Sequence, residues 1–286
     1  MKASKFLSPL LGLLLAGTAP QGHASGYQPP RTAAGKPDLN GVWQVMNNAN
    51  YNVEPDNARA ALQMRAGPVV PVPAKELVAL GAVGAVPASL GVIVDQGEEK
   101  KIPYQVWALK QRDDNRAHWI ERDPEVKCYL PGVPRASYMP HPFRIVHNDD
   151  ALFFSYAYAG AVRNIHLSDP GPAPIDSWMG QSWARWEGDT LVIETTGQND
   201  QTWLDRAGNF HSELLRVTER YTRTSDYTIE YEARLEDEKV YSAPWTMRMN
   251  LYRRVGADDR VLQFNCVELV EEMFYGKLRK HPVDGE

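Results

Sequence analysis

The sequence predicts a mainly β protein, an antiparallel meander that is either closed as a barrel or folded as a sandwich. From residue 142 onward, apolar and polar side chains alternate with a period of two, as they do along strands with one buried face. Turn-forming runs such as Asn148-Asp149-Asp150 and Glu187-Gly188-Asp189 separate these stretches at hairpin spacing. Most connections are too short for helical crossovers, which disfavours a parallel α/β sheet.

We expect nine strands in this region. They are Phe143–His147, Ala151–Tyr158, Val162–Leu167, Gln181–Trp186, Thr190–Thr196, Leu214–Arg223, Thr228–Leu235, Trp245–Arg254 and Val261–Val267. Within the sixth, alternation places Glu219 on the same face as Leu215, Val217 and Tyr221. A carboxylate among apolar neighbours is costly to bury unless it is paired or its protonated form is used.

The first part of the chain predicts less regular structure. Gly41-Val42-Trp43 opens a short apolar stretch that we expect to form a strand. Residues 55–100 are rich in Pro, Val, Ala and Gly, which indicates an irregular segment wrapped on the body. Pro103 is typical of a first helical turn, so we expect one helix from there to about residue 121, ended by Asp123-Pro124.

The first 24 residues have the layout of a secretory signal peptide. Lys2 and Lys5 precede the apolar run Phe6–Ala19, and Gly22-His23-Ala24 supplies small residues at a cleavage site. The run is too short to span a bilayer, although an N-terminal membrane anchor is the alternative. We therefore expect a periplasmic or secreted protein with no membrane span after signal removal.

The mature chain is expected to form a single domain. Residues 25–141 would supply an extended segment, the first strand and the helix, packed on the barrel, and residues 142–286 would form the barrel body. Cys128 and Cys266 are the only cysteines, and in an oxidising compartment pairing is the default. Such a bridge would stabilise the fold by about 5 kcal/mol. A catalytic thiol or a metal pair is the alternative, but no CxxC or Cys/His cluster accompanies either residue.

Composition and missing motifs exclude several function classes. The chain of 286 residues has 31 Lys and Arg against 36 Asp and Glu, a formal net charge of −5. This balance argues against nucleic acid as the main partner. There is no G-x-S-x-G elbow, P-loop, H-E-x-x-H or G-x-G-x-x-G after a strand, so nucleotide-dependent and serine-hydrolase functions have little support. We expect no cofactor.

Several motifs resemble those of a family of uncharacterised secreted bacterial proteins. The matching stretches are Gly35–Trp43, Cys128–Arg135, Trp178–Gly180, Trp186–Leu191, Asn199–Asp205, Gly208–Ser212 and Glu219–Tyr221. The opening Gly41-Val42-Trp43 is also similar to the G-x-W start of lipocalin-like (calycin) barrels. The resemblance implies a lipocalin-like barrel but no particular activity. Many members have His where this chain has Gln181, which puts a catalytic role for that position in doubt.

The densest polar and aromatic stretch, residues 199–221, is the candidate site. We expect His211 to be a general acid or base, with Glu219 and Asp205 as its partners. The candidate ligand-binding residues are Trp178, Trp183, Arg185, Trp203, Tyr221, Tyr231 and Met247. The structural alternative is that Asp200 and Asp205 cap the turn and that Glu219 pairs with an inward arginine such as Arg185.

Metal binding is the weaker possibility. His147, His166 and His211 could be drawn together as a three-histidine site, but strand spacing alone does not bring them together. Ordinary hydrogen-bonded histidines are the alternative, and we expect no metal.

Two functions remain open. The first is an exported enzyme that binds a hydrophobic small molecule and acts on it by cofactor-independent acid/base catalysis, as an isomerase, a hydratase or lyase, or a hydrolase. The second is a non-catalytic periplasmic carrier with a lipocalin-like pocket. Ionisable groups converging within hydrogen-bond reach would favour the enzyme, and an apolar cup with one polar rim would favour the carrier.

Overall fold

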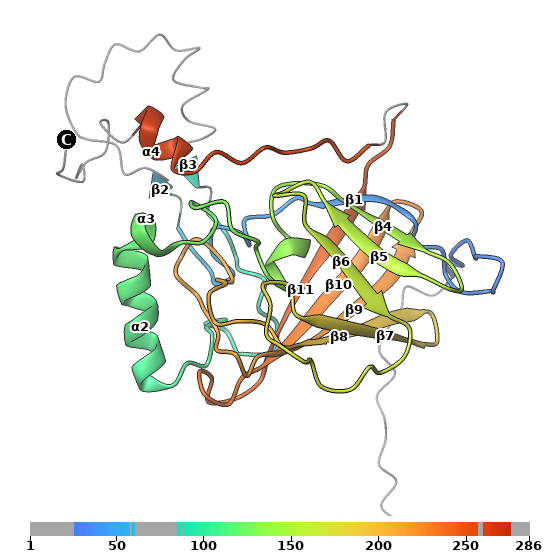
Figure 1. Cartoon of the computed structure of the whole chain (residues 1–286), viewed down its shortest axis with the longest axis horizontal. Coiled ribbons are helices and arrows are strands. Elements are labelled where there is room, and N and C mark those ends of the chain that lie inside the picture. The colour runs from blue at the N-terminus through green and yellow to red at the C-terminus, as the bar shows by residue number, and fades with distance from the viewer. Residues whose placement is uncertain (1–25, 58, 61–84, 87, 257–259, 276–286) are drawn as a thin grey trace, which may run out of the picture.

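The body of the protein is a closed barrel of nine strands (Figure 1). The computed structural model describes residues 26–57, 59–60, 85–86, 88–256 and 260–275. The expected signal peptide and part of the Pro-rich segment lie outside these residues. The mainly β prediction is confirmed, and of the two expected architectures the structure has the barrel.

The barrel strands are five to ten residues long and follow one another in chain order around the barrel. They are β1 (Gly41–Val45), β4 (Phe143–His147), β5 (Leu152–Tyr156), β6 (Val162–His166), β7 (Gln181–Glu187), β8 (Thr190–Thr196), β9 (Arg216–Ser225), β10 (Thr228–Glu236) and β11 (Trp245–Arg253). Strand β1 pairs with both β4 and β11 and so closes the barrel. All neighbours are antiparallel except β6 and β7, which share only two parallel residue pairs.

Eight of the nine strands expected after residue 142 are present, and the ninth is wrong. The segment Val261–Val267 forms no strand and makes only an isolated bridge between Phe264 and Tyr158. The physical reason is that β1 already occupies the free side of β11, so a closed barrel offers no edge for another strand.

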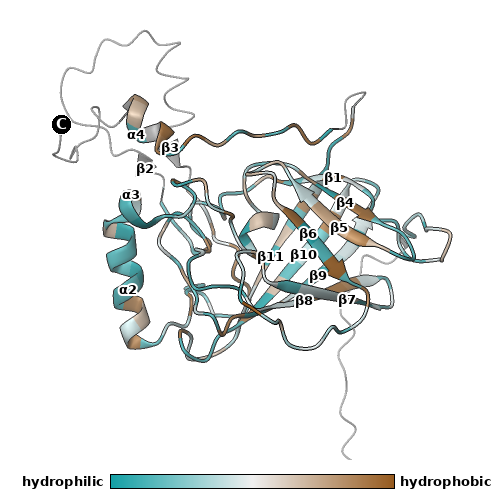
Figure 2. Ribbon diagram, viewed as in Figure 1, coloured by the Kyte–Doolittle hydropathy of each residue, from teal (hydrophilic) through white to brown (hydrophobic). Residues whose placement is uncertain are grey.

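The single expected helix is also corrected. It begins at Val106, three residues after Pro103, and a non-helical His118 divides it into α2 (Val106–Ala117) and α3 (Trp119–Arg122). Figure 2 shows α2 as largely hydrophilic, in keeping with a helix that buries only Ala108 and Asn115. None of the helices among the described residues is long and apolar enough to cross a membrane.

Smaller elements surround the barrel. A 3-10 helix η1 (Arg135–Ser137), a two-stranded sheet of β2 (Arg59–Ala60) and β3 (Ala85–Val86), and a helix α4 (Val270–Tyr275) were not expected from the sequence. The three residues of η1 are buried. Its last residue, Ser137, reaches the barrel interior.

Side chains fill the barrel interior. The alternation in β9 holds, because Val217, Glu219 and Tyr221 are all fully buried. Trp43 on β1 is also fully buried, and its indole N–H donates to the carbonyl of Leu39 over 2.9 Å. The prediction that Gly41-Val42-Trp43 opens a strand is confirmed.

Candidate functional site

The disulfide lies beside a largely apolar cavity. Cys128 and Cys266 are bridged, as the sequence predicts, with their Cα atoms 5.6 Å apart. The bridge joins the loop after α3 to the C-terminal segment. Two backbone hydrogen bonds hold the same segment, one from the amide of Leu269 to Val126 and one from the amide of Phe264 to Ala157. The C-terminal segment is thereby laid against the body.

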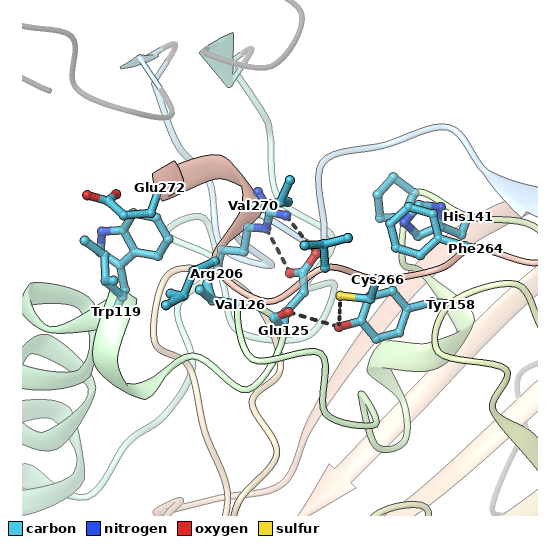
Figure 3. Close-up of a pocket in the computed structure, with 14 residues that line it drawn as sticks. Trp119, Glu125, Val126, His141, Tyr158, Arg206, Phe264, Cys266, Val270 and Glu272 are labelled. Atoms are coloured by element: carbon cyan, nitrogen blue, oxygen red, sulfur yellow. Dashed lines mark hydrogen bonds and ion pairs between the residues drawn. The ribbon is translucent and has the colours of Figure 1, made fainter. Parts of the chain in front are cut away.

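Between this segment and the body lies a cavity of about 250 Å³ (Figure 3). Its walls come from α3, the loop that carries Cys128, the chain before β4 and the C-terminal segment. Most of the lining is apolar, contributed by Trp119, Ile120, Val126, Pro140, Tyr158, Phe264, Val267, Leu269 and Val270. We call it the disulfide cavity.

Among the described residues that line the disulfide cavity, three are charged: Glu125, Arg206 and, on α4, Glu272. Glu125 accepts two hydrogen bonds from Arg206, each 2.8 Å long, and pairs with the buried Arg135 on its other side. Burial disfavours the charged form of Glu125, but Arg206 and Arg135 outweigh it and lower its pKa to about 2. At neutral pH the lining therefore presents the Glu125 carboxylate paired with the Arg206 guanidinium, while Arg135, which does not line the cavity, pairs with the same carboxylate.

His141 is the one imidazole of the cavity lining. Its ring lies 4.3 Å from the ring of Phe264 and 5.9 Å from that of Tyr158, centroid to centroid (Figure 3). Burial lowers the pKa of His141, so the ring is neutral at neutral pH. Its nitrogens have no hydrogen-bond partner within the described part of the chain.

Asp205, one of the three expected catalytic residues, organises a turn. One carboxylate oxygen accepts the amides of Ala207 and Asn209, and the other accepts the amide of Val53 and the side chain of Asn209. Burial raises the pKa of Asp205 to about 6, although these hydrogen bonds oppose the shift. The next residue, Arg206, lines the disulfide cavity, whereas Asp205 does not line this cavity.

His211 is buried with both ring nitrogens occupied. Nδ1 lies 2.8 Å from the carbonyl of Ser212 and Nε2 lies 2.5 Å from the hydroxyl of Thr202. A carbonyl can only accept, so Nδ1 carries the proton and Nε2 accepts from the threonine. Burial lowers the pKa of His211 and keeps it neutral. No hydrogen bond or ion pair joins it to Glu219 among the described residues.

Glu219 lies inside the barrel as an ion-paired carboxylate. Its partner is Arg163 on β6, and the hydroxyls of Tyr221 and Tyr231 each donate to it over 2.9 Å. Arg185, the partner that the structural alternative names, instead pairs with Glu187 and Glu194 on the surface. Two expected ligand-binding residues, Tyr221 and Tyr231, thus bind the carboxylate.

The remaining expected ligand-binding residues are dispersed. Met247 and Trp203 are buried, and Trp178 contacts the ring of Tyr129 at 5.1 Å. Trp183 carries Arg185 over its ring at 5.2 Å, and both line a second hollow of about 390 Å³. None of these side chains lines the disulfide cavity.

The three-histidine metal site does not form. His147 accepts the amide of Leu39 through Nε2 over 2.9 Å, His166 is exposed, and His211 is engaged as described above. Among the described residues, no group of three or more His, Cys, Asp or Glu side chains could hold a metal ion.

Sequence reasoning missed Glu125, His141 and Arg206 as site residues. They come from three separate segments, and no local motif joins them. The one available signal was the predicted disulfide, because a bridge between Cys128 and Cys266 must bring the neighbours of both cysteines together. Comparison of the chain with protein-family models, curated proteins and solved structures finds no match.

Proposed function

We propose that this protein is an exported binding protein for a small hydrophobic molecule, which it holds in the disulfide cavity. The observation that carries the proposal is the composition of the walls: most of the described lining is apolar or aromatic, and its charged groups are the paired Glu125 and Arg206 and a second carboxylate, Glu272. Concave sites of this composition, with few polar groups, are the usual form of small-molecule sites.

The size of the cavity limits the ligand. A volume of about 250 Å³ lies just below the range of about 300–1,000 Å³ that is common for ligand pockets. A compact molecule with one or two rings suits it. The side-by-side rings of His141 and Phe264 offer a stacking surface to such a ligand.

The geometry favours a carrier over an acid/base catalyst. With a pKa of about 2, Glu125 cannot donate a proton at neutral pH. The three residues expected to be catalytic, Asp205, His211 and Glu219, are engaged in internal hydrogen bonds and do not line the cavity. An apolar cup with one polar wall is the arrangement expected of a carrier.

Acid/base catalysis remains a second candidate because of His141. Its neutral ring lines the cavity with nitrogens that no described residue occupies. If the ligand is turned over, His141→Gln should abolish turnover while ligand affinity is kept. Turnover that survives this substitution would leave binding as the function.

Export is part of the proposal. The apolar N-terminal run and the bridge between Cys128 and Cys266 support it, because disulfides persist in oxidising compartments outside the cytosol. Fractionation of the producing cell, with detection of the mature chain in the periplasm or medium, tests this part.

Native mass spectrometry tests the binding proposal. We expect the protein isolated from its own compartment to carry a small molecule of constant mass. Val126→Phe adds volume to the cavity wall and should abolish the adduct, whereas Val106→Phe, at an exposed position on α2, should keep it. Equal occupancy in both variants would place the ligand elsewhere.

A further inference from the structure

A third hollow, distinct from the disulfide cavity, gathers three arginines. It has a volume of about 400 Å³, and its lining includes Arg223 from β9, Asp226 from the β9–β10 turn, and Arg253 and Arg254 at the end of β11. We call it the arginine hollow. Nothing in the proposed binding function uses it.

Arg223 holds a positive charge that forms no ion pair with a carboxylate among the described residues. The side chain is 5% exposed, and its guanidinium donates to the backbone carbonyls of Asp38, Ser225 and Asp226. These carbonyls accept from three of its five N–H groups and do not cancel the charge. Among the described residues, no carboxylate lies within ion-pair distance of this guanidinium.

Arg253 and Arg254 have no side-chain partner at all within the described residues. The Arg253 side chain lies over Gly41, where an added Cβ would come 3.3 Å from its Nε. Gly41 also has a φ of +145°, so a glycine both tolerates the backbone and leaves room for the guanidinium. This gives the glycine of Gly41-Val42-Trp43 a role beyond starting β1.

This absence of partners is unusual for the chain. Among the described residues, eleven other arginines each form an ion pair with a carboxylate. The protein as a whole is acidic, with a formal net charge of −5. Among the described residues that line the arginine hollow, Asp226 is the one carboxylate, and it accepts a hydrogen bond from Tyr27 over 3.0 Å. The lining is therefore left with an excess of two positive charges.

We propose that the arginine hollow binds the phosphate group of a phosphomonoester. The planar fork of a guanidinium matches two phosphate oxygens at once, and charge-assisted hydrogen bonds of this kind are among the strongest in proteins. A phosphomonoester carries about −1.5 to −2 charges at neutral pH, which offsets the excess of two, whereas a single carboxylate would offset half of it. Free phosphate and a lipid with a terminal phosphate present the same group.

Calorimetric titration of the oxidised protein with inorganic phosphate, at constant ionic strength in chloride, tests the proposal. We expect R253Q/R254Q to bind phosphate at least about tenfold more weakly than the wild type, a loss of about 1.4 kcal/mol. The matched control is R248Q on the same strand, because Arg248 is exposed and paired with Glu232; its affinity should stay within about twofold of wild type. Equal thermal midpoints of the variants show that folding is kept.

A second experiment distinguishes a lipid phosphate from free phosphate as the bound group. Co-sedimentation with phosphatidylcholine vesicles, with and without phosphatidic acid, reports binding to a lipid phosphate. Binding to either probe that R253Q/R254Q loses and R248Q keeps supports the proposal. Absence of binding to both probes, or equal binding by R253Q/R254Q and wild type, overturns it.

One further variant tests whether nearby carboxylates of the chain itself occupy the arginines. The sequence places Asp258 and Asp259 shortly after Arg254, outside the described residues. Phosphate binding that appears only in D258N/D259N would mean that these carboxylates occupy the arginines, and it would overturn the proposal. We expect D258N/D259N to bind phosphate at least as tightly as the wild type.

Discussion

Glu219 on β9 and Arg163 on β6 form a fully buried ion pair inside the barrel, although β7 and β8 lie between their strands. Arg163 also donates to Ser182 on β7 over 2.8 Å and to Thr195 on β8 over 2.6 Å. One guanidinium thus joins four consecutive strands through side chains. The carboxylate that looked like a catalytic acid in the sequence is part of this internal scaffold.

The first prediction concerns Glu219→Gln. We expect a loss of about 3–5 kcal/mol in the free energy of unfolding, because the substitution leaves the buried charge of Arg163 without its counter-charge. Denaturant unfolding measures the loss. The double variant R163M/E219Q removes both charges and should recover much of it. If Glu219→Gln keeps full stability but loses ligand binding, the carboxylate is a site residue after all.

Trp43 provides a second prediction. Removing a fully buried indole leaves a large cavity, so Trp43→Ala should destabilise the protein by about 3–5 kcal/mol. Trp43→Phe keeps an aromatic ring but loses the hydrogen bond to the Leu39 carbonyl, and a smaller loss is expected. Both are measured by denaturant unfolding. A loss below about 1 kcal/mol for the alanine variant would be incompatible with a core position.

Asp205 should make stability depend on pH. Its pKa is about 6 in the folded protein against 3.8 for the free side chain, so the folded state holds the proton more tightly. The stabilisation is complete below about pH 4 and is lost as pH rises through 6, by about 3 kcal/mol in total.

The check is a comparison with Asp205→Asn, which cannot titrate. The unfolding free energy of the wild type relative to this variant should fall by that amount between pH 4 and 7. A difference that stays constant with pH would mean that the hydrogen bonds to Asp205 cancel the effect of burial.

The disulfide allows predictions about stability and about ligand binding. Thiol titration of the unfolded, unreduced protein should find no free thiol, because Cys128 and Cys266 are bridged. Cys128→Ser/Cys266→Ser should lose about 5 kcal/mol of stability in the chain-entropy model. It should also lose the small-molecule adduct, since the bridge holds one wall of the disulfide cavity. Retention of the adduct would show that the hydrogen bonds of the C-terminal segment suffice.

The strands could be predicted well because their signal is local. Alternation of buried and exposed side chains placed Glu219 correctly inside, and turn residues marked the hairpins. Val261–Val267 has the same local pattern, but whether a strand forms there depends on a free edge, which is a property of the whole barrel. The break at His118 likewise has no strong sequence signal, since neither Gly nor Pro lies there.

The candidate site was harder to predict because its parts come together only in the folded chain. The loop around Asp205 was identified as a candidate site, but the side chain of this loop that lines the disulfide cavity is Arg206. The structural alternative named Arg185 on β7 as the partner of Glu219. The partner is Arg163 on β6, because Arg163 points inward and Arg185 points outward. Composition and spacing carry no information on which of two nearby arginines faces the interior.

The closure of the barrel by β1 has a consequence for when the protein can fold. Strand β1, near the start of the described residues, needs β4 on one side and β11 on the other, so the last barrel contacts wait until residue 253 is available. Contacts between such distant residues form slowly. If the chain crosses a membrane from its N-terminus, the barrel cannot close until nearly the whole chain has crossed. No completed barrel would then have to be unfolded for the crossing.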